Sequence, residues 1–189
     1  MKITIPTDIS DITISQHKKY LKLKKREDDI TPNEFNKRAI SIFTNLPYHT
    51  IEKIKVSDYL VLVEDIIKAL ETPALFKNKF ELKGIEYGFI TNFDEISQGE
   101  WIDIIEYQKD ENEINKLMAI LFRPIVKSDP FGNYEIKSYT GTGERATLFE
   151  DMPMSIVNGA LGFFLTLSSE LKTHIQRSTI VELQKVARV

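Results

Sequence analysis

The spacing of apolar residues in this sequence changes from a helical period to a strand period just after residue 73. Before that point, apolar residues recur every three or four positions, as they do along one side of a helix. From Phe80 to Phe89 they alternate with other residues around Lys83-Gly84, which is the pattern of two strands joined by a two-residue turn. A chain with both periods is neither all-helical nor all-strand, so the sequence predicts an α+β fold that is mostly helical.

Two capping boxes mark the starts of helices in this sequence. In Thr31 to Glu34 and in Ser97 to Glu100, a hydroxyl and a carboxylate three residues apart can satisfy the first backbone N–H groups of a helix. Pro32 also stands at the first helical position, which proline favours. We therefore expect helices over about 32–45 and 98–107.

A third helix is expected between these two. Ser57 repeats the cap, with Val56 and Val61 as the apolar pair that would pack across it, and Thr72-Pro73 ends the segment. The regular apolar positions of this helix form the stripe that a helix normally buries: Leu60, Val63, Ile67 and Leu70.

The hairpin near 80–90 has a defined register if its turn contains two residues. That register places Phe80 opposite Tyr87 on the apolar face and Glu81 opposite Glu86 on the outer face. Like charges directly opposite each other are mildly unfavourable, so we expect the outer face to meet a basic partner. A weaker strand pair is predicted near 126–140, around a turn-rich segment at 129–133.

The chain has no internal repeat, low-complexity tract or Gly/Ser linker, so the sequence predicts a single domain over 1–189. Its parts are an N-terminal helical part (1–73), a hairpin and helix (74–125), a strand insertion (126–146) and C-terminal helices (147–189). In the last part we expect Gly159 and Gly162 to mark close packing against another backbone, because glycine lowers helix propensity.

Motifs of catalysis and metal binding do not occur in this sequence. It has no cysteine, and His17, His49 and His174 lack a second ligand at metal-binding spacing. Walker A, G-x-S-x-G, H-E-x-x-H and EF-hand patterns are also missing. We therefore expect no catalytic residue, metal or cofactor and a protein that is not an enzyme. Acid or magnesium chemistry from carboxylates that are distant in sequence stays open as an alternative.

The charge balance does not favour nucleic acid as the default partner. The chain has 25 basic and 28 acidic residues, and its formal net charge is −3. One dense basic run spans His17 to Arg26 and could form a helix face that contacts phosphates, with Lys18, Lys22 and Lys25 as the candidates. A solvated helix face, or a rim that meets an acidic protein, explains the same run.

A DNA-associated protein is therefore the alternative function that this run supports. Basic C-terminal positions at Lys172, Arg177, Lys185 and Arg188 would add to it. The longest nearly apolar stretch, 156–167, is too short to span a bilayer, and the first residues contain no apolar core of a targeting signal. We expect no membrane association, and the lack of cysteine suits a reducing cytosol.

Three segments resemble small morphogenesis proteins of tailed bacteriophages, particularly crAss-like and related phages of Bacteroidetes hosts. They are Phe80 to Phe89, Ser97 to Asp103 and Lys116 to Ile125, and the residues at 2–6 and 9–23 resemble the same group. The hairpin followed by a helix is also similar to tail assembly chaperones.

This resemblance implies a non-enzymatic structural role in the virion, at the head, the head-tail connector or the tail, with assembly in the bacterial host cytoplasm. The implied partners are other phage structural proteins, and self-association in a ring is a further option. A tail assembly chaperone that is absent from the mature particle is the alternative. The residues we predict in the contact region are Phe80, Glu81, Glu86, Tyr87 and Trp101.

Overall fold

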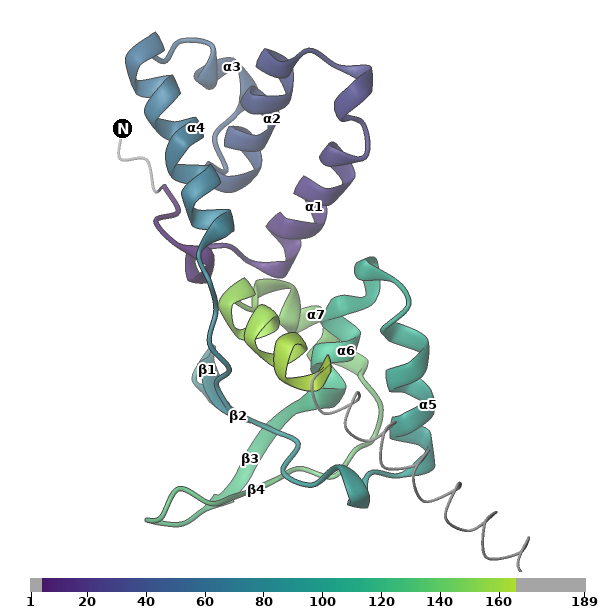
Figure 1. The fold of residues 1–189 in the computed structure, drawn as a ribbon. Coiled ribbons are helices and arrows are strands. Elements are labelled where there is room, and N and C mark those ends of the chain that lie inside the picture. The colour runs from purple at the N-terminus through teal and green to yellow at the C-terminus, as the bar shows by residue number, and fades with distance from the viewer. Residues whose placement is uncertain (1–4, 166–189) are drawn as a thin grey trace, which may run out of the picture.

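The computed structural model describes residues 5–165, which form an α+β fold with a helical part above a part that contains the sheet (Figure 1). The upper part consists of α1 (Ile14–Lys24), α2 (Pro32–Thr44), α3 (Tyr48–Ile51) and α4 (Val56–Glu71). The lower part adds α5 (Gln98–Tyr107), α6 (Ile114–Leu121), α7 (Gly143–Leu148) and helical residues 154–165. Its strands are β1 (Lys79–Leu82), β2 (Ile85–Phe89), β3 (Phe122–Ser128) and β4 (Tyr134–Ile136).

Helix starts follow the predicted caps at two of three places. The Ser97 hydroxyl accepts from the Glu100 N–H and the Glu100 carboxylate accepts from the Ser97 N–H, so the box at α5 is confirmed. At α2 only half of the predicted box is formed: the Thr31 hydroxyl accepts from the Glu34 N–H, while the Glu34 carboxylate accepts from Arg38. The cap at Ser57 is wrong, because α4 begins at Val56 with Lys55 as its N-cap.

The four strands form one antiparallel sheet in the order β1-β2-β3-β4. The predicted register of the first hairpin is confirmed, with Phe80 opposite Tyr87 and Glu81 opposite Glu86. Lys83 and Gly84 both have positive φ, 50° and 77°, as the turn that joins two strands through two residues requires. The second strand pair begins earlier than predicted, since β3 follows α6 directly at Phe122.

A single hydrophobic core connects the helical part to the sheet. Backbone hydrogen bonds join the two parts near its centre, from the Ile14 N–H to the Met152 carbonyl (3.0 Å) and from the Met154 N–H to the Ile12 carbonyl (2.8 Å). One continuous cluster of buried side chains runs across this junction. The helical surfaces described below are therefore attached to a packed body.

Candidate protein-interaction surface

The most regular apolar stripe of α4 faces outward. Its residues have heptad spacing, with successive intervals of 4, 3, 4 and 3 from Val56 to Leu70. Val56, Leu60 and Ile67 are 74%, 60% and 49% exposed, and Val63 is half-buried. We call this set the α4 stripe: Val56, Leu60, Val63, Ile67 and Leu70.

The expectation that this stripe is buried is wrong for Leu60 and Ile67, which are exposed, whereas Val63 and Leu70 are partly buried and pack against the core. The core side of α4 is formed by Leu62, Ile66 and Ala69, all of them buried. The two stripes lie side by side on the helix and share the same period, so spacing alone does not say which one is buried. Ala69 in the inner stripe allows closer packing than a row of larger side chains would.

A groove runs between the α4 stripe and α2. It holds a hollow of about 280 Å³, to which α1 contributes Tyr20 and α2 contributes Phe35. Ile67 lines the hollow and is also among the exposed members of the stripe, so the hollow and the exposed surface are continuous. The remaining apolar residues that line it are Pro32, Ala39, Ile40, Val63, Ile66 and Leu70.

The charged residues next to this groove are mainly acidic. Glu27 lines the hollow itself, and Glu64 and Glu71 are exposed on the outer flank of the α4 stripe. Glu64 pairs with Lys68 at 2.7 Å, and the hydrogen bond from Lys68 lowers the pKa of the Glu64 carboxyl, which therefore stays ionised. An apolar groove with an acidic border suits a partner that is apolar on one face and basic at its edges.

One of the predicted contact residues, Tyr87, lies in the core, and Phe80 packs against it. Tyr87 is 2% exposed, and its ring stacks on Phe80 with the centroids 5.4 Å apart. Phe149 meets the Tyr87 ring edge-on at 5.0 Å. Tyr87 is therefore a packing residue rather than a contact residue, and the half-buried Phe80 supports it from the neighbouring strand.

The other three predicted contact residues are at the surface but on different sides of the molecule. Glu81 and Glu86 are exposed on the outer face of the β1–β2 hairpin. Trp101 is 46% exposed beside Ile102 on α5, which Figure 1 shows on the opposite side of the lower part. They therefore do not form one contact surface.

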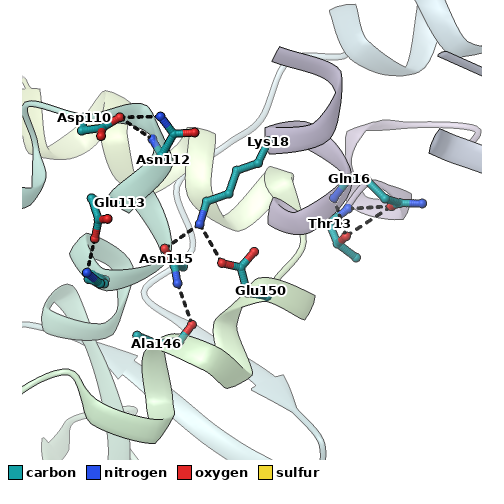
Figure 2. A network of polar contacts seen from close by, with 10 residues as sticks. Thr13, Gln16, Lys18, Asp110, Asn112, Glu113, Asn115, Ala146 and Glu150 are labelled. Carbon is teal, nitrogen blue, oxygen red and sulfur yellow. Dashed lines mark hydrogen bonds and ion pairs between the residues drawn. The ribbon is translucent and has the colours of Figure 1, made fainter. Parts of the chain in front are cut away.

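The predicted nucleic-acid contact Lys18 points into the protein. Figure 2 shows its ammonium between Asn115 on α6 and Glu150 (η5, Phe149–Asp151), at 2.7 Å from an oxygen of each. The Asn115 amide in turn donates to the Ala146 carbonyl at 2.9 Å. Because the Lys18 side chain is only 13% exposed and both partners hold it, it is not available to a phosphate.

Lys22 and Lys25 remain at the surface. Lys25 pairs with Glu111 at 2.5 Å, while Lys22 is exposed and lines a second hollow. The three candidates therefore point in different directions and do not form one phosphate-binding row. The basic C-terminal positions, Lys172, Arg177, Lys185 and Arg188, lie outside the described residues.

The Lys18 network is expected to contribute to stability. Lys18→Met should lower the free energy of unfolding by about 1–2 kcal/mol, because it leaves the Glu150 carboxylate and the Asn115 oxygen without their donor. Lys22→Met removes the same charge from the same helix and should change stability by less than about 0.5 kcal/mol. Urea unfolding followed by circular dichroism measures both, and equal losses would contradict a role for the network.

A buried ion pair holds α5 against the sheet. Arg123 on β3 and Glu100 on α5 are 2.9 Å apart, with side chains that are 9% and 6% exposed. Nearby, the Tyr139 hydroxyl donates to Asp103, and burial together with this bond raises the pKa of Tyr139 above its usual range. Glu100, Arg123 and Tyr139 border a polar hollow of about 400 Å³. Their contacts position α5, although Arg123 Nε and Glu100 Oε1 have no hydrogen-bond partner among the described residues.

Within residues 5–165, no three His, Asp or Glu side chains are grouped as metal ligands would be. No helix in this described part is long and apolar enough to cross a membrane. Comparisons with protein-family models, curated proteins and solved structures find no match for the chain. The geometry of the described residues is therefore what points to a function.

Proposed function

We propose that this chain is a non-enzymatic protein-binding module that holds an amphipathic helix of a partner polypeptide in the groove between α2 and α4. The observation that supports this is the α4 stripe, an exposed apolar row at heptad spacing beside a hollow. Heptad spacing is the pattern by which one helix packs its apolar side chains between those of another.

Burial of this surface is large enough to support a complex. Leu60 and Ile67 are 60% and 49% exposed, so burial of the remaining surface of each is worth roughly half of the 1.5–3 kcal/mol of a whole side chain, about 1 kcal/mol. The partner's own apolar residues would gain a similar amount in the hollow. The entropy of association offsets part of this gain, so we expect a weak complex rather than a tight one.

The acidic border of the groove specifies the partner further. Glu27, Glu64 and Glu71 would face the edges of a bound helix, so lysine or arginine beside its apolar row would be favoured. An acidic helix with the same apolar row would be repelled. The partner we propose is therefore a basic amphipathic helix.

The sequence resemblance suggests the setting of this binding. We propose that the partner belongs to a tailed bacteriophage, and that the chain is a virion structural protein or, as the alternative, a tail assembly chaperone. Mass spectrometry of purified particles distinguishes these roles, because a chaperone would be absent from them. A chain that is absent from particles and binds none of the co-expressed head and tail proteins would contradict both.

Substitutions on the stripe test the groove directly. Helical peptides are selected from a displayed random library with the wild-type chain as bait, and their affinities are measured by fluorescence anisotropy. Leu60→Lys should weaken binding about tenfold or more, as expected for a central interface residue. Val61→Lys is the matched control, since Val61 is also exposed but does not belong to the α4 stripe, and it should leave binding within about twofold.

The selected sequences and the oligomeric state supply the contrary outcomes. We expect apolar residues at heptad spacing with basic neighbours, and acidic or aperiodic sequences would contradict the proposal. If Leu60→Lys and Val61→Lys weakened peptide binding equally, the peptide would bind outside the α2–α4 groove. A wild-type dimer in sedimentation that Leu60→Lys dissociates would mean that a second copy of the chain occupies the groove instead.

A further inference from the structure

The helical part has a second hollow, of opposite charge to the groove. It has a volume of about 360 Å³ and lies where α1 and α2 meet near α3. Leu23, Ile30 and Ile42 supply apolar side chains to its lining. Lys19, Lys22 and Arg26 line it as well and are exposed.

The spacing of the basic run explains why these three cations gather here. Lys19 and Lys22 are three positions apart on one side of α1, and Arg26 lies just beyond the end of that helix. Lys18 and Lys25 project from another side, toward Glu150 and Glu111. The structure thus divides one basic run into a paired set and a set that borders the hollow.

The cations at the hollow are available to a ligand. Among residues 5–165, none of Lys19, Lys22 and Arg26 makes an ion pair, whereas Arg38, which also lines the hollow, is held by Glu34 at 2.6 Å. Three unpaired cations around an apolar floor match a ligand that carries negative charges next to an apolar group.

We propose that this hollow binds an acidic polypeptide segment that inserts one apolar side chain between Leu23, Ile30 and Ile42. Its carboxylates would pair with Lys19, Lys22 and Arg26 at the rim. This site is separate from the α2–α4 groove and takes a partner of opposite charge. The chain would then contact two different segments, one basic and helical and one acidic.

An acidic polypeptide fits this hollow better than a nucleic acid does. Glu27, Asp28 and Asp29 follow Arg26 directly, so the cations end there and match a few carboxylates beside an apolar side chain rather than an extended phosphate backbone. Tyr48 is the aromatic residue of the lining, and Lys37 already lies over its ring, 5.7 Å from the centroid, where a base would stack. A leucine-sized side chain requires neither a path for a phosphate backbone past the rim nor a free aromatic face.

The test uses the full chain and a fluorescein-labelled ten-residue peptide of alternating glutamate and aspartate with one central leucine. Anisotropy should show saturable binding that weakens with salt. Lys22→Glu should reduce the affinity about tenfold, since it replaces an attraction by a repulsion at the rim. Lys24→Glu makes the same charge change on the same helix but outside the hollow, and it should have an effect of less than about twofold.

Further probes separate this site from its alternatives. Serine in place of the central leucine should weaken binding about tenfold, because the apolar anchor is lost. Leu60→Lys should leave binding of the acidic peptide unchanged. The proposal for this hollow can therefore fail independently of the proposal that the α2–α4 groove binds a helix. No saturable binding at millimolar peptide, or equal losses for Lys22→Glu and Lys24→Glu, would overturn the proposal. Tighter binding of a ten-nucleotide single strand that Lys22→Glu abolishes would overturn it in favour of nucleic acid.

Discussion

Replacing Arg123 with methionine is expected to lower the free energy of unfolding by about 3–5 kcal/mol, the largest single effect we expect in this chain. The variant would leave the Glu100 carboxylate buried beside the sheet without its cation. Burial lowers the pKa of the Arg123 guanidinium and Glu100 raises it, which indicates a desolvated group that depends on its partner. Glu100 also caps α5, so the loss should extend to that helix.

Urea unfolding followed by circular dichroism measures this effect, and two further variants make it specific. Arg123→Met combined with Glu100→Leu removes both charges and should recover much of the lost stability. Glu100→Gln retains an acceptor and should lower the free energy of unfolding less than Arg123→Met does. Its stability can still be measured if Arg123→Met does not fold. A loss of less than about 1 kcal/mol for Arg123→Met would show that the pair is solvated.

Gly159→Ala is expected to be the second most destabilising change, at about 2–3 kcal/mol. A Cβ atom at this position would lie 2.5 Å from the Leu75 carbonyl oxygen and 2.9 Å from the Phe76 Cα. Both are backbone atoms, which cannot rotate away as a side chain could. The segment after α4 would have to move off residues 154–165, and the stacking of Phe76 on Phe163 would be disturbed.

Gly162→Ala is the matched control, because it lies in the same helical segment and a Cβ there meets none of the described residues within 4 Å. Alanine has the higher helix propensity, so this variant should be neutral or more stable by up to about 1 kcal/mol. Opposite signs for the two variants in thermal unfolding are the expected result. Equal effects would mean that the contact with Leu75 does not restrict position 159.

The hairpin and the caps could be predicted from the sequence because their causes are local. The register of β1 and β2 depends on the Lys83-Gly84 turn and on alternation within ten residues. The box from Ser97 to Glu100 needs only its own side chains. The close packing expected at the two glycines is confirmed for Gly159, whereas within residues 5–165 no atom lies within 4 Å of a Cβ placed at Gly162.

The surfaces could not be predicted in the same way, because they depend on contacts between distant segments. In the sequence Lys18 belongs to a basic run, but in the structure its ammonium points into the protein and donates to Asn115 and Glu150. Tyr87 is predicted in the contact region, but Phe149, which is distant in sequence, packs against its ring. The sequence nevertheless contains a pattern that predicts the groove, because α4 carries two apolar stripes. A helix that packs on one side leaves the other stripe uncovered.

The claim that the α2–α4 groove receives a partner helix is tested most directly by methyl NMR on protein labelled at Ile, Leu and Val. Saturation with the selected basic amphipathic peptide should shift the methyl signals of Leu60, Val63, Ile67 and Leu70 most strongly. The methyl signals of Ile102 on α5 and Val126 on β3, which are also exposed, should remain in place. Shifts that are confined to Ile102 or Val126, with the α4 stripe unchanged, would contradict the account.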